Sequence, residues 1–465
     1  MIHWLQHETG GLLTLSAISI ALLLIMIIRF KVEPFIALLI AGLLVALAAG
    51  LPVETLVGSA QKASGSLLEG GFGGILGHIA SIIGLGTLLG AILEASGGAE
   101  VLTGSLLKAF GEKRAPLAMG LAGLIFGVPV FFDIGIFVLA PLVYVAAKQG
   151  GKSIVLYAMP LLAGLSVMHA FMPPHPGPVA AAGLLHVSLG WIIIMGLACA
   201  IPAWFVGGIL YSTWIGKRIN VPVPEEMLAA AEEAKGENKV KNPPSLGLVL
   251  GIIAIPLVLI LAGTFGSILL TKGSRLYGVF TFFGTPAVAL TIAVLLATYL
   301  LGYRRGMTRE QLTELTGKSL RPVGMILLVV GAGGFFGAVL SATGVGKVLA
   351  TSLADAGLPV IALAYVISCG MRIAQGSATV AIVTTTGIVA PVVADLNYSQ
   401  PQLALLVMSI AAGSIIASHV NDGGFWIVSR YFGLSVKETL QTWTVLETVL
   451  SVVGFIMAAG LSLVV

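Results

Sequence analysis

Two polar interruptions in otherwise apolar sequence decide the fold: Phe126-Gly-Val-Pro-Val-Phe-Phe-Asp-Ile-Gly135 and Cys369-Gly-Met-Arg-Ile-Ala-Gln-Gly-Ser-Ala-Thr379. Each lies midway along a hydrophobic stretch that is too long for one membrane crossing and too broken for one helix. Each places an ionisable group, Asp133 or Arg372, at a depth where an uncompensated charge is costly. Broken hydrophobic segments at corresponding positions of two halves are typical of a transporter's binding site.

The composition indicates a polytopic membrane protein. The 465 residues are 57% hydrophobic and 9% charged, whereas soluble proteins usually carry about 25% charged residues. The net charge of +4 fits basic cytoplasmic loops and gives no reason to expect a nucleic-acid partner. The first apolar run lacks a basic region before it and a small-residue cleavage site after it, so we predict a retained span. Cys199 and Cys369 stand alone, which predicts packing thiols and no metal site.

Apolar segments of about 20 residues predict membrane spans. We expect ten of them: 12–29, 34–51, 72–94, 153–186, 189–215, 246–270, 276–302, 322–343, 401–430 and 440–464. Basic residues flank segment 115–147 at both ends, whereas Asp355 and Asp395 flank segment 358–393. The positive-inside rule therefore predicts two re-entrant hairpins that enter the membrane from opposite faces, with both termini outside.

An internal repeat relates the two halves. Residues 84–97, GLGTLLGAILEASG, align with residues 331–344, GAGGFFGAVLSATG, and the match continues through Leu106 and Leu353. With the topology above, the two copies lie upside down relative to each other, as in many secondary transporters. We therefore predict an all-α protein of two inverted repeats, with an N-terminal half at 1–216, a cytoplasmic linker at 217–245 and a C-terminal half at 246–465.

The two hairpin tips carry different chemistry. Asp133 lies among helix-breaking glycine and proline residues, where it serves either as a proton-carrying carboxylate or as a helix N-cap. Arg372 has a planar fork that matches the two oxygens of a carboxylate. Ser377 and Thr379 follow it at a predicted helix start, where backbone N–H groups favour anions. In the alternative interpretation, Arg372 forms an internal ion pair with Asp133 or Asp422 and contacts no substrate.

Two further motifs break the spans that follow the hairpins. In HAFMPPHPGP, residues 169–178, the prolines predict unwound backbone, and His169 and His175 are of a type that titrates near neutrality. In SHVNDGGFW, residues 418–426, Asn421 and Asp422 either bind hydroxyl groups and a proton or simply cap a helix break. We expect Glu447 nearer the end of its span and Trp443 in an interfacial aromatic belt.

Several function classes have no support in the sequence. The chain has no ATP-binding P-loop, no HExxH motif and no CxxC motif, so we predict neither an enzyme nor a bound cofactor. An anion channel is the alternative among membrane proteins. Two unlike broken motifs favour alternating access over a channel, because a channel filter is usually symmetric.

The motifs HxFxPPHPGP (residues 169–178), RIAxGSATVA (372–381) and SHVNDxGFW (418–426) together resemble the gluconate permease family, within the ion transporter superfamily. The resemblance covers essentially the whole chain. It implies import of gluconate or a related small hydroxy- or amino acid with protons, separate scaffold and transport domains, a homodimer and an elevator-type motion. Members of the family often carry Glu where this chain has Asp133, which shortens the reach of the carboxylate and leaves the exact substrate open.

We therefore predict a proton symporter for a gluconate-like anion in a bacterial inner membrane, surrounded by lipid. The predicted carboxylate ligands are Arg372, Ser377 and Thr379, the predicted hydroxyl ligands are His175, Asn421 and Asp422, and the candidate proton carriers are Asp133, Asp422 and His169. The residues alone leave open D-serine, lactate, hydroxybutyrate or a dicarboxylate as substrate, and sodium as the coupling ion.

Overall fold

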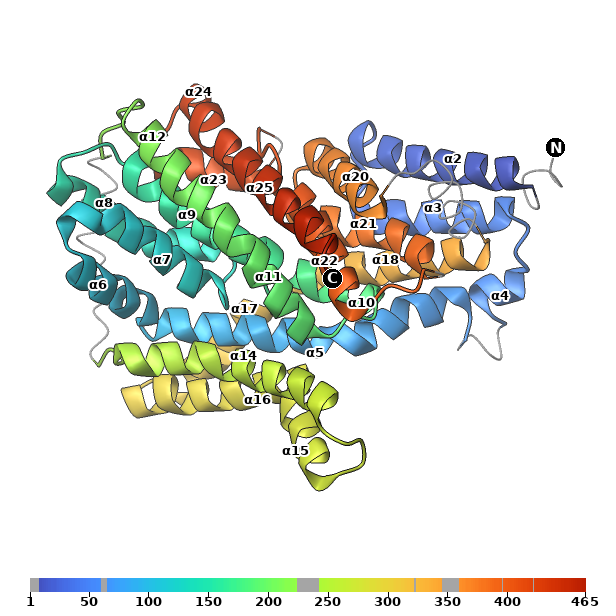
Figure 1. The fold of residues 1–465 in the computed structure, drawn as a ribbon, viewed down its shortest axis with the longest axis horizontal. Coiled ribbons are helices and arrows are strands. Elements are labelled where there is room, and N and C mark those ends of the chain that lie inside the picture. Colours follow the sequence, from blue (N-terminus) through green and yellow to red (C-terminus); the bar gives the residue numbers. More distant parts are fainter. Residues whose placement is uncertain are drawn as a thin grey trace.

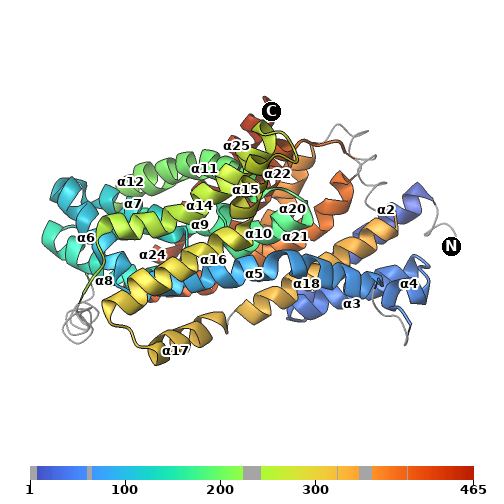
Figure 2. The ribbon, with the colours of Figure 1, turned by 90° about the horizontal axis from the view of Figure 1, so that it is seen from below.

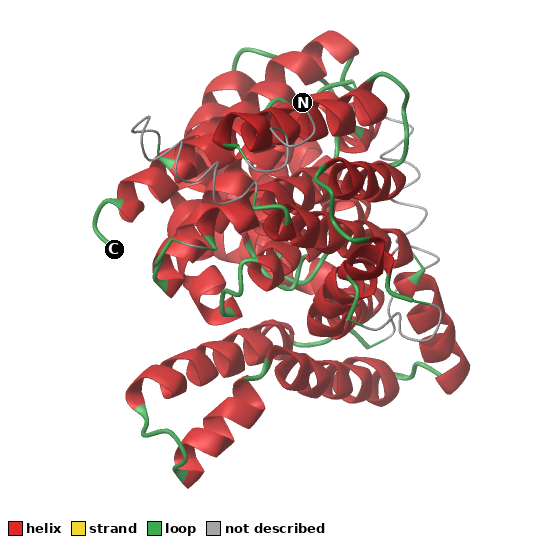
Figure 3. Cartoon of the chain, turned by 90° about the vertical axis from the view of Figure 1, so that its right-hand side faces the viewer, coloured by secondary structure: helices red, strands yellow, loops and turns green. Residues whose placement is uncertain are grey.

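The structure is a computed structural model that describes residues 8–59, 65–223, 242–321, 323–344, 359–394, 396–420 and 422–465. Regular structure in these ranges is helical (Figures 1 and 3). The N-terminal half contains α2 (Thr9–Ile28), α3 (Pro34–Ala48), α4 (Val53–Val57), α5 (Leu67–Ala95), α6 (Gly98–Phe110), η1 (Glu112–Arg114), α7 (Ala115–Gly127), α8 (Phe132–Gly150), α9 (Val155–Phe171), α10 (Pro176–Leu184), α11 (Leu189–Trp204), η2 (Phe205–Tyr211) and α12 (Ser212–Gly216).

The C-terminal half contains α14 (Leu246–Leu269), α15 (Arg275–Gly284), α16 (Pro286–Ala297), η3 (Thr298–Gly302), η4 (Tyr303–Arg305), α17 (Arg309–Leu320), α18 (Val323–Ala342), α20 (Val360–Gln375), α21 (Ala378–Val393), α22 (Gln400–Ile415), α23 (Gly423–Tyr431), α24 (Val436–Thr439), η5 (Leu440–Thr444) and α25 (Val445–Ser462). Most of the expected linker, residues 224–241, lies outside the described residues, as do residue 358 and the 348–353 part of the repeat.

Eight helical stretches, some of them composed of two consecutive helices, are long and apolar enough to cross a membrane when the described residues are considered: Leu67–Ala95, Phe132–Gly150, Val155–Leu184, Leu189–Gly216, Leu246–Leu269, Pro286–Arg305, Arg309–Ala342 and Val436–Ser462. Shorter apolar helices accompany them at Pro34–Ala48, Val360–Ala374, Ala378–Val393 and Gln400–Ile415. The predicted class, an all-helical polytopic membrane protein, is confirmed. The count of ten spans and the inverted orientation of the repeats stay predictions.

Both interrupted segments fold as two helices joined by a short break. In the first, α7 ends at Gly127 and α8 begins at Phe132. In the second, α20 ends at Gln375 and α21 begins at Ala378. Gly376 has φ +84, a left-handed conformation that glycine adopts without steric cost, so this residue can turn the chain between two apolar helices.

The two motifs that follow the hairpins also break their helices. The Pro-rich motif is unwound over a shorter stretch than we expected, because α9 runs to Phe171 and α10 begins at Pro176. A proline in the first turn of a helix removes an N–H that has no intrahelical partner, so the helix resumes without a lost hydrogen bond. In the second half, α22 ends at Ile415 and α23 begins at Gly423.

Two other expectations need correction. The expected span 276–302 is not one helix, because Pro286 starts a new helix directly after α15. Helices α14 and α16 pack against α11 and α5, respectively, and α15 extends away from the bundle at their end (Figures 1 and 3). Part of the expected loop 303–321 is the helix α17, whose first turn is stabilised by a capping box between Thr308 and Gln311.

Close glycine contacts hold the broken helices in place. A Cβ atom on Gly164 of α9 would lie 2.7 Å from the backbone oxygen of Gly120 in α7, so only glycine allows this approach. Helix α18 packs against α5, α3 and α21, and Figure 2 shows α18 alongside α5. Helix α22 packs against both α20 and α25, and these helices form a second packed group. The breaks of both halves therefore meet inside one packed bundle.

Candidate functional site

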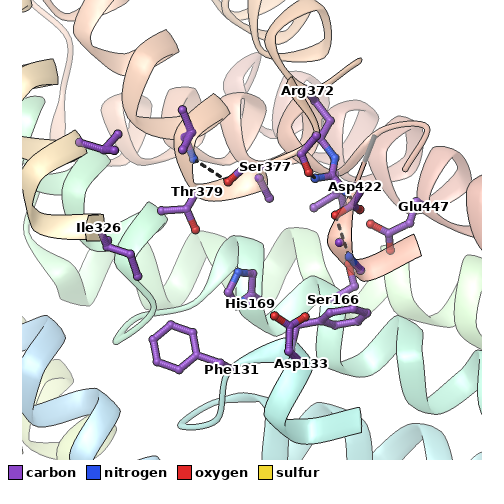
Figure 4. A pocket seen from close by; sticks show the side chains of 18 of the residues that line it. Phe131, Asp133, Ser166, His169, Ile326, Arg372, Ser377, Thr379, Asp422 and Glu447 are labelled. Carbon is purple, nitrogen blue, oxygen red and sulfur yellow. Dashed lines mark hydrogen bonds and ion pairs between the residues drawn. The ribbon is translucent and has the colours of Figure 1, made fainter. Parts of the chain in front are cut away.

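A cavity of about 430 Å³ lies at the breaks of the two halves (Figure 4). Its lining comes from the starts of α8, α21 and α23, from α9 and α18, and from the segment that leads into α25. Backbone that leaves a helix at membrane depth is tolerated where it lines a cavity or is buried in protein. The broken sequence motifs therefore belong to one site.

Three helix N-termini face this cavity, and each brings a partial positive charge from its backbone N–H groups. Asp133 lies in the first turn of α8, and Asp422 is the N-cap of α23, where it accepts a hydrogen bond of 2.9 Å from the N–H of Gly424. Helix α21 instead begins with Ser377 as its N-cap and Thr379 in its first turn, with no acidic residue there. The start of α21 is therefore the end best suited to an anion from outside.

Arg372 connects the end of α20 with the start of α23. Its side chain is 5% exposed. Its Nη2 donates to a carboxylate oxygen of Asp422, and its Nη1 donates to the carbonyl oxygen of Gly376. Asp422 also accepts from the hydroxyl of Ser418. The internal pair that the sequence left as an alternative is thus present, and it holds the guanidinium group at the edge of the cavity.

Three buried polar atoms of the lining residues have no hydrogen-bond partner in the described protein: Arg372 Nε, His169 Nδ1 and Glu447 Oε1. An unsatisfied buried polar group costs about 1–3 kcal/mol. The three atoms belong to different helices, α20, α9 and α25, yet line one cavity. All three atoms are buried in the cavity wall, so an occupant of the cavity reaches them only after the side chains move.

Most of the predicted site residues line the cavity together: Arg372, Ser377, Thr379, Asp422, Asp133 and His169. Asp133 is exposed, whereas Asp422 is buried. His175 is buried and lies outside the lining, where its Nε2 donates to the carbonyl oxygen of Gly127 over 2.7 Å and its ring lies 4.8 Å from that of His169. His175 therefore links the break between α9 and α10 to the break between α7 and α8. Asn421 lies outside the described residues.

Three lining residues were placed wrongly or missed by the sequence reasoning. Glu447, expected near an interface, is 1% exposed and lines the cavity. Trp443 is buried rather than part of an aromatic belt, because its ring stacks on Phe132 at 5.2 Å and its Nε1 donates to the Ser418 hydroxyl. Ser166 of α9 was not singled out. In the sequence, Glu447 follows Trp443 by four residues, a spacing that places both on one helix face without showing what that face meets.

Comparison with known proteins fits this architecture. The model of the family described as "GntP family permease" matches residues 12–464. The chain belongs to the GntP permease family. It is 42% identical to the inner membrane permease YgbN of Escherichia coli K12, over 97% of this chain and 98% of that protein. It is 40% identical to the gluconate permease of Pseudomonas aeruginosa, over 99% of both.

The fold also resembles a solved structure, the YdaH transporter of Alcanivorax borkumensis. The TM-score is 0.62 at 15% sequence identity, over 93% of this chain and 98% of that one. At this identity the likeness concerns the fold alone. This GntP-family chain is thus a multi-pass membrane transporter and not an enzyme.

Proposed function

We propose that this GntP-family permease imports gluconate or a closely related small hydroxy-carboxylate across a bacterial inner membrane, together with protons. The observation that carries the proposal is Arg372 beside the acid-free N-terminus of α21 in a cavity of about 430 Å³. The name of the Pseudomonas relative supports gluconate as the substrate class. A pocket of this size falls in the range that small-molecule ligands use.

The proposed pose places the substrate carboxylate between Arg372 and the start of α21. The guanidinium group of Arg372 lines the cavity and supplies charge-assisted donors, and Ser377 and Thr379 lie on the same side of the cavity (Figure 4). The hydroxyl chain then extends toward Asp422 and His169, with Asn421 as a further predicted ligand. His175 lies outside the cavity lining and stabilises the break after α7 through its hydrogen bond to the Gly127 carbonyl oxygen.

A second cavity, of about 760 Å³, supports alternating access. Like the first cavity, it is lined by α18 and α21. The lining residues lie further along both helices, at Gly334–Ser341 of α18 and at Ala390–Ala394 at the end of α21. Between the two cavities the helices touch at Gly333 and Gly387, where a Cβ atom on Gly387 would lie 3.0 Å from the Gly333 carbonyl oxygen. We propose that movement of the hairpin helices relative to α18 opens the site to each side in turn, in an elevator-type motion within a homodimer.

Uptake into proteoliposomes tests the function directly. With labelled gluconate, an acidic outside and no sodium, we expect saturable accumulation that collapses when a protonophore removes the pH gradient. Accumulation that requires sodium and ignores pH would contradict proton coupling, and non-saturable flux without counterflow exchange would indicate a channel. Competition by unlabelled D-serine, lactate and hydroxybutyrate then ranks the candidate substrates by affinity. A compound that competes better than unlabelled gluconate would replace gluconate as the proposed substrate.

A further inference from the structure

Glu447 is a buried acid at the cavity that neither the sequence motifs nor the relatives' names assign to any role. It lies on α25 with 1% exposure, and its Oε1 has no hydrogen-bond partner in the described protein. Figure 4 shows its carboxyl group beside Asp422 and above Ser166. The Ser166 hydroxyl of α9 forms a hydrogen bond with this carboxyl group, and the charges of Arg372 and Asp422 act on it from the same cavity. A carboxyl group in this setting is free to change its protonation state without breaking an ion pair.

The other acids of the cavity are placed differently. Asp422 already accepts from Arg372, from Ser418 and from the N–H of Gly424, and all three donors stabilise its ionised form. Asp133 is exposed and lies at the N-terminus of α8, where the helix dipole also favours a negative charge. Glu447 has no donor of comparable strength.

The charge balance of the site points to the same residue. Among the described lining side chains, Arg372 has the one permanent positive charge, whereas Asp133, Asp422 and Glu447 carry carboxyl groups and His169 is a neutral or cationic ring. A substrate carboxylate adds a further negative charge next to Arg372. A proton on Glu447 removes one negative charge from the same cavity without disturbing the pair of Arg372 and Asp422.

We propose that Glu447 takes up the proton that travels with the substrate, while Asp422 stays ionised as the fixed partner of Arg372. The proton comes from water on the outer side, binds a carboxylate oxygen of Glu447 and leaves to water on the inner side, so no other reactant is needed. The neutral acid then has an O–H to donate to Ser166 or to a substrate hydroxyl. Substrate and proton therefore favour the same loaded state, with a coupling of about 5- to 150-fold in affinity, as is typical of linked sites.

The role of Glu447 rests on the proposed proton symport. Two measurements distinguish a failure of the symport proposal from a failure of the Glu447 assignment. Purified protein in weakly buffered detergent solution is mixed with gluconate while a pH dye records proton uptake, and reconstituted protein is tested for accumulation driven by a pH gradient and for gluconate counterflow. Wild-type protein should take up protons on binding and accumulate substrate. Glu447→Gln should still bind and exchange gluconate, but it should take up no proton and lose accumulation. Glu94→Gln, at a partly buried glutamate outside the cavity, is the matched control and should behave as wild type.

Each outcome decides the question. If wild-type protein takes up no proton and does not respond to the pH gradient, proton symport and this assignment fall together. If wild-type protein is coupled and Glu447→Gln is equally coupled, only the assignment to Glu447 is overturned, and Asp133→Asn then tests the next candidate carrier. If Glu447→Gln does not fold, Glu447→Asp replaces it: a shifted pH profile of gluconate binding supports the role of Glu447, and an unchanged profile refutes it.

Discussion

Replacement of Arg372 by glutamine tests the centre of the proposed site, because this residue has two roles that a second mutation can separate. As a structural partner, it neutralises Asp422 in a buried pair. As a proposed ligand, its guanidinium group at the cavity donates to the substrate carboxylate. Removal of one member of a buried ion pair typically costs about 3–5 kcal/mol of stability. Because Asp422 keeps its hydrogen bonds from Ser418 and Gly424, we expect Arg372→Gln to cost about 3 kcal/mol of stability, at the lower end of this range.

The effect on gluconate affinity has a separate magnitude. A hydrogen bond to a charged group contributes about 1.5–3 kcal/mol, which corresponds to about 10- to 100-fold in the dissociation constant. The double variant Arg372→Gln with Asp422→Asn carries neither charge, so it should regain most of the lost stability. It should not regain affinity, since the carboxylate ligand is still absent. Arg430→Gln, at an exposed arginine on α23, is the control and should change neither quantity.

Denaturant titration in detergent measures the first quantity, and gluconate binding by calorimetry measures the second. Wild-type affinity in the double variant would refute Arg372 as the carboxylate ligand. A single variant as stable as the wild type would refute the structural role of the pair. Recovery of both stability and affinity in the double variant would show that Arg372 acts only by neutralising Asp422.

Other predictions concern the supports of the site. Ser377→Ala should lower stability by about 1 kcal/mol through loss of the α21 N-cap, and it should also weaken gluconate binding. Ser399→Ala, which removes the N-cap of α22 outside the cavity, should lower stability alone. Equal losses of gluconate binding in the two variants would contradict a role for the start of α21. His175→Ala should cost about 1–3 kcal/mol in denaturant unfolding because the buried Gly127 carbonyl loses its partner, and an unchanged unfolding midpoint would refute that support. Gly164→Ala should cost about 1–3 kcal/mol by forcing α9 away from α7, whereas Gly104→Ala, where nothing lies within 4 Å, should be neutral or slightly stabilising in the same assay.

The sequence predicted the site where its signals were local. Helix breaks follow from Gly and Pro at fixed positions, so the breaks near Asp133, His169, Arg372 and Asp422 were found and all four residues line one cavity. Ser377 was expected at a helix start, and the structure shows it as the N-cap of α21. The length of the Pro-rich break was overestimated because prolines are tolerated in a first turn as well as in a loop.

Glu447 and Trp443 show where local signals failed. Each belongs to a long C-terminal helical segment, Val436–Ser462, whose sequence does not reveal which face meets protein and which meets lipid. The contacts that bury them come from α8, α9 and the loop before α23, far away in the chain. Their distance from the helix ends was a poor guide, since a polar residue in a span is buried wherever a neighbouring helix covers it.

The sequence by itself determined that this chain is a polytopic membrane protein and where its helices break, because hydropathy and the backbone preferences of Gly and Pro act over a few residues. Only the tertiary structure decided which broken ends share a cavity, that Arg372 is paired with Asp422, that His175 bonds to the Gly127 carbonyl outside the cavity lining, and that Glu447 lines the same cavity. These relations join helices that are distant in the chain. They depend on how helices such as α7 and α9 pack at glycine contacts, and no local pattern encodes that packing.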